Sequence, residues 1–155
     1  MRIGIGYDVH PFDATRPLHL GGVRIDGSPG LSGHSDADAL LHAVIDALLG
    51  AAGLGDIGQH FPAGDPAYKD IDSRELLRRT RDLLAEKGYR AGNIDATVIA
   101  ESPRLAPHLP EMRSAIAGVI GIDESRVSVK ATTHEGLGAI GRGEGIAAMA
   151  VALIE

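Results

Sequence analysis

The 155-residue chain contains no cysteine and no tryptophan, and only two phenylalanines and three tyrosines. Without cysteine it can form neither a disulfide framework nor a thiolate site, so any metal ligands must be histidine, aspartate or glutamate. The few aromatic side chains leave little for base stacking, and the formal net charge of -6 disfavours contact with a phosphate backbone. These absences argue against a nucleic-acid-binding protein.

Long apolar runs are also absent. No segment approaches the roughly 20 apolar residues that a membrane span needs. The N-terminal sequence MRIGIGYDVH lacks the basic, long apolar and small-residue regions of a signal peptide. We therefore expect a cytoplasmic protein without a membrane partner. The chain length corresponds to one domain with one core, so residues 1–155 are expected to form a single domain.

Hydrophobic periodicity predicts an α/β (α+β) fold. Apolar residues recur at helical spacing between residues 37 and 49, where Asp36 is a suitable N-cap and Gly50 or Gly53 a suitable end. Further elements are expected as helices at 72–87 and 107–121, strands at 2–8, 93–101, 126–133 and 144–154, a hairpin at 19–25 and loops at 28–36 and 53–70. The predicted architecture is a four-stranded mixed sheet covered by three helices on one face.

The first predicted strand, at residues 2–8, is expected to belong to the core and runs directly into an acid and an imidazole. Asp8 and His10 are two residues apart, so both side chains point to the same face if the strand continues to His10. His42 is the single histidine of the helix predicted at 37–49. One carboxylate and two imidazoles form a three-ligand set of the kind that catalytic zinc uses, with a fourth position open. The alternative is that His42 is a hydrogen-bonded core residue.

The loop SGHSDAD, residues 32–38, places His34 and Ser35 just before a predicted helix N-terminus, which favours an anion such as phosphate. Asp36 and Asp38 oppose an anion by their charge, and we interpret both as helix caps rather than catalytic groups. His34 can be a phosphate donor or a general acid, and the alternative is a solvated loop residue.

The C-terminal segment VKATTHEGLGAIGRGEG contains the spacing G-x-G-x-x-G at Gly136, Gly138 and Gly141. A dinucleotide-binding fingerprint needs a helix after the glycines and an acidic residue about 20 positions further on. Here a strand-like segment is expected to follow, and the sequence ends at Glu155. The pattern therefore indicates a loop whose glycines permit unusual backbone angles.

Polar side chains precede these glycines. Thr132 and Thr133 can donate to phosphate oxygens, although threonines at a strand end are also ordinary β-formers. Glu135 offers a carboxylate that suits a hard divalent cation.

Taken together and in this order, these segments resemble the 2-C-methyl-D-erythritol 2,4-cyclodiphosphate synthases of the non-mevalonate isoprenoid pathway. The resemblance covers nearly the whole chain. It is carried by the blocks GYDVHPF, GHSDADALLHAVIDALLGAAGLGDIGQHFP, DPAYKDIDSRELL, PHLPEMR and VKATTHEGLGAIGRGEGIAA. It implies a lyase that converts 4-diphosphocytidyl-2-C-methyl-D-erythritol 2-phosphate to 2-C-methyl-D-erythritol 2,4-cyclodiphosphate and CMP.

The resemblance also implies roles for individual residues. Asp8, His10 and His42 match the positions that bind zinc. Glu135 matches the ligand of a magnesium or manganese ion that bridges the substrate phosphates. His34 and Thr133 match catalytic residues that stabilise the transition state. The implied substrate contacts are Asp8, His10, His34, Ser35, Asp56, Ile57, Gly58, Phe61, Pro62, Ala63, Gly64, Asp65, Ala100, Glu101, Ser102, Pro103, Arg104, Leu105, Ala106, Thr132, Thr133, His134, Glu135 and Arg142.

These implied contacts follow the parts of the substrate. Residues 56–58 match the ribose side, residues 61–65 match the methylerythritol part, and residues 100–106 match the cytosine pocket. The chain departs from the family pattern at three positions, which are Arg104 in place of a common lysine, His134 in place of a common threonine and Ala139 in place of a common phenylalanine.

The resemblance further implies a homotrimer with its sheets around the threefold axis and its active sites between subunits. Two alternatives remain open. In one, the metal is structural and the strand GIAAMAVALI lines an axial channel that binds an isoprenoid diphosphate with the help of Arg142. In the other, the protein is a zinc hydrolase whose water is activated by Asp46, one helical turn beyond His42.

Overall fold

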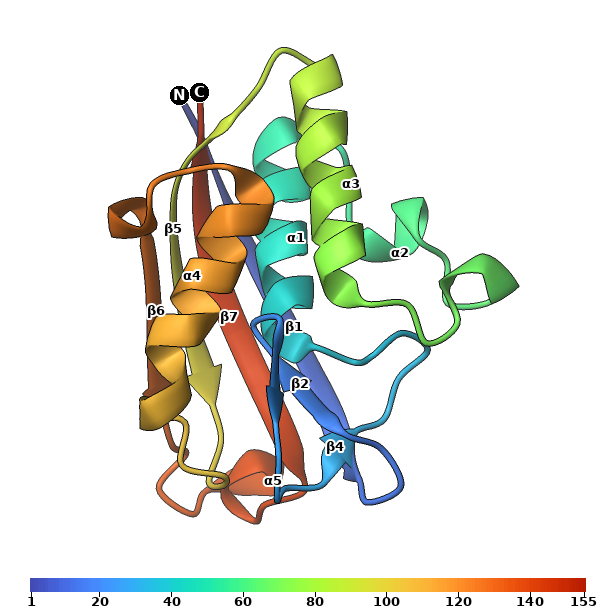
Figure 1. Ribbon diagram of the computed structural model, residues 1–155, viewed down its shortest axis with the longest axis vertical. Helices are drawn as coiled ribbons and strands as arrows, with labels where there is room; N and C mark the ends of the chain where they lie inside the picture. The colour runs from blue at the N-terminus through green and yellow to red at the C-terminus, as the bar shows by residue number, and fades with distance from the viewer.

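The computed structural model describes residues 1–155 and contains one main sheet with helices on one of its faces (Figure 1). The sheet has five strands in the order β4-β1-β7-β5-β6. β5 and β6 are parallel, and the other neighbouring strands are antiparallel. The strands are β1 (Arg2–Asp13), β4 (Gly30–Leu31), β5 (Ala91–Ile99), β6 (Val127–Thr132) and β7 (Gly145–Ile154).

All four predicted strands are present, and the sheet is mixed as predicted. The predicted number of strands was wrong, however, because β4 adds a fifth strand to the sheet. This two-residue strand lies in a segment expected to be a loop, and it pairs with Phe12 and Asp13 at the end of β1. β1 itself runs five residues beyond its predicted end at Asp8, because backbone pairing with β7 continues through His10 and Pro11. Asp8 and His10, which suggested that the strand ends there, do not interrupt the ladder.

Three helices cover one face of the sheet, as predicted (Figure 1). They are α1 (Ala39–Ala52), α3 (Ser73–Glu86) and α4 (Leu109–Ile120). Two single-turn helices, α2 (Ile57–His60) and α5 (Gly138–Gly141), raise the number to five and correct the predicted three, since one turn is too short to show a hydrophobic period. No helix has the length and apolar content needed to cross a bilayer.

Three 3-10 helices and a hairpin complete the structure. The 3-10 helices are Pro66–Tyr68, Ala106–His108 and Glu124–Arg126. The hairpin consists of β2 (Leu18–Leu20) and β3 (Val23–Ile25) and forms a separate two-stranded sheet. It turns on Gly21 and Gly22, whose φ angles of 60° and 78° lie in the left-handed region that favours glycine. The predicted hairpin is thus confirmed.

Asp38 is the N-cap of α1, which confirms its interpretation as a helix cap, whereas Asp36 does not cap this helix. The side chain of Asp38 is fully buried and accepts hydrogen bonds from the backbone N–H groups of Leu41, Gly21 and Gly22 at 2.9, 2.9 and 2.7 Å. One carboxylate therefore satisfies the first turn of α1 and fixes the hairpin to it. The helix ends at Gly53, one of the two predicted positions, with a φ of 71°.

Gly4 and Gly6 of β1 face α1, whereas the large apolar side chains of the strand lie on the open face of the sheet. A Cβ on Gly6 would lie 1.9 Å from the carbonyl oxygen of Ala43 in α1. Ile3, Ile5 and Tyr7 point the other way and are 71%, 64% and 55% exposed. The expectation that these apolar side chains belong to the core is therefore wrong for this chain. The strand packs on α1 through its backbone, and this close approach brings the start of α1 against the centre of β1.

Candidate active site

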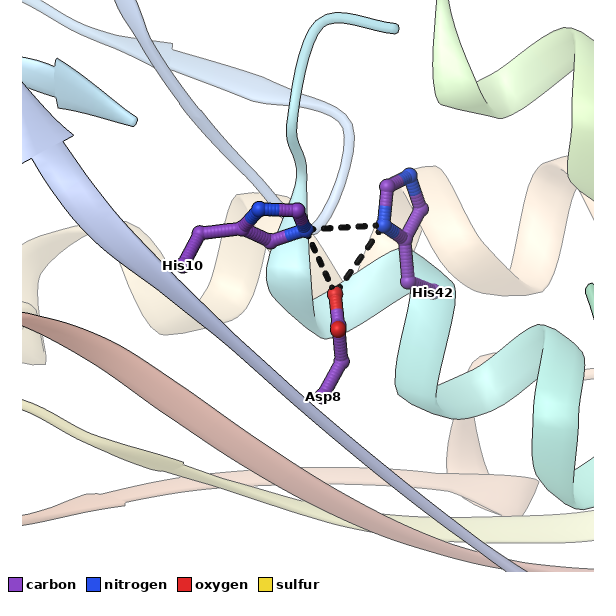
Figure 2. Close-up of side chains that lie close together, drawn as sticks. All are labelled: Asp8, His10 and His42. Atoms are coloured by element: carbon purple, nitrogen blue, oxygen red, sulfur yellow. Dashed lines mark hydrogen bonds and ion pairs between the residues drawn. The ribbon is translucent and has the colours of Figure 1, made fainter. Parts of the chain in front are cut away.

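The three predicted zinc ligands converge where α1 lies against β1 (Figure 2). Asp8 Oδ2 lies 2.8 Å from His10 Nε2 and 3.0 Å from His42 Nδ1, and the two imidazole nitrogens are 3.3 Å apart. Asp8 and His10 share the helix-facing side of β1 because the strand continues past both residues. His42 reaches them from the first turns of α1. The predicted convergence of these side chains is confirmed.

Hydrogen bonds on the far sides of the two rings hold them in place. His10 Nδ1 lies 2.7 Å from the carbonyl oxygen of Ser32. A carbonyl oxygen can only accept, so His10 Nδ1 donates a proton to it, and a neutral ring would offer the lone pair of Nε2, the nitrogen beside Asp8, to a metal ion. His42 Nε2 lies 3.0 Å from Ser73 Oγ and 3.1 Å from Ser35 Oγ, which leaves Nδ1 facing Asp8.

The electrostatics of the cluster favour a cation between the three side chains. Burial raises the pKa of Asp8, but the hydrogen bonds with His10 and His42 outweigh burial and hold that pKa well below its usual range. Burial lowers the pKa of His10, whereas the bond to Asp8 raises it, and the net effect is an increase. Two nitrogen donors and one carboxylate oxygen that attract positive charge in this way fit a zinc ion.

A cavity of about 220 Å³ adjoins the three ligands. Six further residues with predicted substrate contacts line it, namely His34, Ser35, Ile57, Gly58, Phe61 and Ala63. Tyr68 also lines the cavity and packs edge-on against Phe61, with ring centroids 5.5 Å apart. Tyr68 was missed in the sequence analysis, although it lies within the block DPAYKDIDSRELL. The chain thus forms one concave site around the predicted metal ligands.

Two hydrogen bonds fix the loops around this cavity. His34 Nε2 donates to the carbonyl oxygen of Asp65 at 2.9 Å, which joins the loop before α1 to the loop after α2. The Asp46 carboxylate accepts from the backbone N–H of Ile57 at 2.7 Å and so positions the first turn of α2. Asp46 was singled out only as the base of a hydrolase. Its carboxylate instead supports the backbone beside Ile57 and Gly58.

Most of the residues predicted for the cytosine pocket line a second cavity, of about 280 Å³, next to the end of β6. Its lining includes Ala100, Glu101, Pro103, Arg104, Leu105, Ala106, Thr132 and Thr133. The carboxylate of Glu101 accepts from the backbone N–H groups of His134 and Gly136 at 2.8 and 3.4 Å, so it supports the glycine-rich loop. This supporting role of Glu101 carries no recognisable signal in the sequence.

Glu135 lies on that loop with an exposed side chain. The Thr133 hydroxyl lies 3.1 Å from the backbone nitrogen of Glu135 and 3.3 Å from its carboxylate. Arg142 pairs with Glu144 at 2.7 Å rather than with Glu135. The G-x-G-x-x-G spacing forms this loop and the single turn of α5 before β7 begins, so it does not open the longer helix that a dinucleotide site needs.

The two groups of site residues lie apart on one chain. Val9, between Asp8 and His10, pairs with Ala147 of β7, which pairs on its other side with Ile99 of β5. Ile99 pairs with Thr132 of β6. Three strand spacings therefore separate the predicted zinc ligands from Thr132, which is roughly 14 Å. The predicted contacts that line neither cavity are Asp56, Pro62, Gly64, Asp65, Ser102, His134, Glu135 and Arg142.

The fold and the site define a class of protein, a single-domain α+β protein in which three side chains that can hold a metal ion lie beside a concave pocket. A family model described as the YgbB family matches residues 1–155. The chain is 60% identical over 154 residues to the 2-C-methyl-D-erythritol 2,4-cyclodiphosphate synthase of Symbiobacterium thermophilum, covering 99% of this chain and 98% of that relative. The chain belongs to the YgbB family, which confirms the resemblance drawn from its sequence.

Solved structures agree with this assignment. The bifunctional IspDF of Campylobacter jejuni matches with a TM-score of 0.95 and 47% identity over 99% of this chain, which spans 42% of that longer protein. IspF of Plasmodium falciparum, solved as a CDP complex, matches with a TM-score of 0.85 and 40% identity, covering 99% of this chain and 94% of that one.

Proposed function

We propose that this chain converts 4-diphosphocytidyl-2-C-methyl-D-erythritol 2-phosphate to 2-C-methyl-D-erythritol 2,4-cyclodiphosphate and CMP. The observation that carries the proposal is the cluster of Asp8, His10 and His42 beside a cavity lined by the expected substrate contacts. The name of the Symbiobacterium relative and the CDP in the Plasmodium complex support this activity and a cytidine diphosphate substrate.

The reaction needs no covalent nucleophile and no water. An oxygen of the 2-phosphate attacks the β-phosphorus, the bond from that phosphorus to the bridging oxygen breaks, and CMP leaves with that oxygen. Asp8, His10 and His42 would hold zinc, and Glu135 would hold magnesium or manganese with the substrate phosphates. Bound there, such cations offset the repulsion between two phosphates on a chain whose own net charge is -6.

The remaining side chains bind and orient the substrate. His34 carries an N–H donor that now bonds to the Asp65 carbonyl and can turn to a phosphate oxygen. The Ser35 hydroxyl lies beside His42 on the cavity wall and suits a phosphate contact. Thr133 supplies a hydroxyl from the second cavity. Holding the attacking oxygen near the β-phosphorus accounts for most of the rate enhancement in this scheme.

Glu135→Gln tests the second cation. The variant keeps the shape of the side chain but removes its charge, so we expect normal zinc content, slower CMP release and a higher magnesium concentration for half-maximal rate. Initial rates are measured across a magnesium titration. Glu111→Gln, at an exposed position on α4, is the matched control and should match the wild type. Superimposable curves for wild type and Glu135→Gln would exclude the metal role.

A homotrimer with sites between subunits would bring the two groups of residues together. Their separation of three strand spacings on one chain supports completion of each site by a neighbouring copy. A continuous apolar surface supports packing of the open sheet face around a threefold axis, and its exposed members are Ile3, Ile5, Tyr7, Val9, Met149 and Val151.

Mixed oligomers test the shared site. His42→Ala and Glu135→Ala, each nearly inactive alone, are unfolded and refolded together at equal concentration. Half of the chains carry an intact His42 and the other half an intact Glu135. Random assembly should therefore give both intact groups to about a quarter of the sites. CMP release by the mixture is compared with that of the variants refolded separately and then combined. No gain on joint refolding would contradict a site built from two chains.

Two further expectations remain predictions. An isoprenoid diphosphate near the threefold axis would have to displace Glu144 from Arg142, because these two exposed side chains pair with each other. The cytoplasmic location, which we expect from the sequence alone, is likewise a prediction.

A further inference from the structure

A line of hydrogen-bonding side chains lies behind His42, on the side away from Asp8. Ser73, the first residue of α3, is fully buried, and its Oγ lies 3.0 Å from His42 Nε2. The hydroxyl of Ser73 lies 2.5 Å from Asp36 Oδ1, and the Ser73 backbone nitrogen lies 2.9 Å from Asp36 Oδ2. One aspartate thus holds both polar groups of the serine that touches the predicted zinc ligand.

The directions of these hydrogen bonds follow from the chemistry of the groups. A carboxylate can only accept, so the Ser73 hydroxyl donates its single proton to Asp36. That hydroxyl can then only accept from His42, which requires a proton on Nε2. In the neutral ring that can bind a metal ion, the lone pair of His42 therefore lies on Nδ1, the nitrogen beside Asp8.

Ser35 does not impose the same direction. Its Oγ lies 3.1 Å from His42 Nε2 and accepts from the backbone N–H of Ala37 at 3.1 Å. The proton of the Ser35 hydroxyl is not committed to a carboxylate, so this group can donate to His42 or accept from it. Ser35 is therefore compatible with either tautomer, whereas Ser73 with Asp36 selects one.

We propose that Ser73 and Asp36 are positioning residues that fix the tautomer and the ring orientation of His42 for metal binding. The inference rests on the proposed function, because it requires that Asp8, His10 and His42 bind zinc. Asp36 does not cap α1, because Asp38 does, and besides Ser73 its Oδ1 accepts only from the backbone N–H of Asp38, at 3.2 Å. The bond to a negatively charged second neighbour also makes Nδ1 a better electron donor to a cation.

Zinc affinity of Ser73→Ala tests the proposal. Purified wild type and variant compete for zinc with a chromophoric chelator, and we expect affinity to fall by about 10- to 100-fold in the variant. A second readout is the Nε2 proton of His42 in the zinc-loaded protein, followed by NMR. It should exchange slowly with water in the wild type and rapidly in Ser73→Ala, an effect that a merely structural serine would not produce.

Thr80→Val is the matched control. Thr80 lies on the same helix and is fully buried, and its hydroxyl donates a hydrogen bond to the carbonyl oxygen of Leu76 at 2.9 Å. Loss of that hydroxyl should leave zinc affinity within about twofold of the wild type, since it does not contact the metal ligands. Asp36→Asn is the second test variant. It keeps the size of the side chain but weakens the bond to Ser73, so zinc affinity should fall.

The outcomes separate this inference from the proposed function. If the wild type binds zinc and the zinc affinity of Ser73→Ala is within about twofold of the wild-type value, the positioning role is wrong and the metal centre stands. If Ser73→Ala does not fold, Asp36→Asn decides, and unchanged affinity in that variant overturns the proposal. If the wild type itself binds no zinc, the metal centre and the inference both fail.

Discussion

His42→Ala should give a folded protein that retains no zinc and releases almost no CMP. His42 supplies one of only three donor atoms, and Asp8 and His10 alone cannot complete the set that zinc requires. The loss of activity should exceed the roughly 100-fold that follows removal of a group behind a metal ligand. Folding should survive because α1 is buried along most of its length by apolar side chains that the substitution leaves in place.

Elemental analysis of the purified variant, with circular dichroism as the folding check, measures this result. His108→Ala is the matched control, since His108 lies at the start of α4 and lines neither cavity of the proposed site. It should keep one zinc per chain and wild-type CMP release. Stoichiometric zinc in His42→Ala would mean that His42 is a hydrogen-bonded core residue and not a ligand.

Gly6→Ala should destabilise the protein by about 3 kcal/mol or more and weaken zinc binding at the same time. The added Cβ would lie 1.9 Å from the carbonyl oxygen of Ala43 and 2.7 Å from the backbone nitrogen of Ala47. Backbone atoms cannot rotate away as a flexible side chain does, so α1 must move off β1. Because His42 lies on α1 and Asp8 on β1, that movement separates the metal ligands.

Urea denaturation and chelator competition measure the two effects. Gly118→Ala is the matched control, because a Cβ at Gly118 of α4 would meet nothing within 4 Å. Removing a glycine from a helix interior should stabilise the control variant by about 0.5–1 kcal/mol. Wild-type stability and zinc affinity in Gly6→Ala would contradict the close packing of α1 on β1.

The cluster of Asp8, His10 and His42 could be predicted from the sequence because the position of each residue depends on a local rule. Alternation along a strand places Asp8 and His10 on one face, and the 3.6-residue period identifies the helix that carries His42. The convergence of the two elements is a tertiary fact, but a three-ligand donor set suggested it. Ser73 gave no such signal, because it reaches His42 across 31 residues of sequence and resembles any serine at a helix start.

The orientation of β1 could not be predicted because it depends on what covers each face. A run of isoleucine, tyrosine and valine normally indicates a core-facing strand. Here Gly4 and Gly6 face α1 at backbone distance, and Ile5 and Tyr7 are left on the open face. The alternation of apolar residues along one chain does not show which face of the strand is left open. The same limit applies to the two cavities, whose proposed joint use would require a second copy of the chain.

The sequence did not predict the three shortest elements, α2, α5 and β4, for a simpler reason. Each spans four residues or fewer, so neither helical nor strand periodicity can build up. They depend on specific hydrogen bonds instead. The Asp46 carboxylate fixes the start of α2, and β4 forms only because β1 extends beyond His10 to meet it.

Phosphorus NMR of the product tests the central claim most directly. Purified protein loaded with zinc is incubated with magnesium and 4-diphosphocytidyl-2-C-methyl-D-erythritol 2-phosphate, with His42→Ala run in parallel. We expect the wild type to produce CMP and the cyclic diphosphate in equal amounts and the variant to produce neither. CMP released with a linear product would indicate a hydrolase, and unchanged substrate would indicate a binding protein. Either result would contradict a cyclising lyase at the Asp8, His10 and His42 centre.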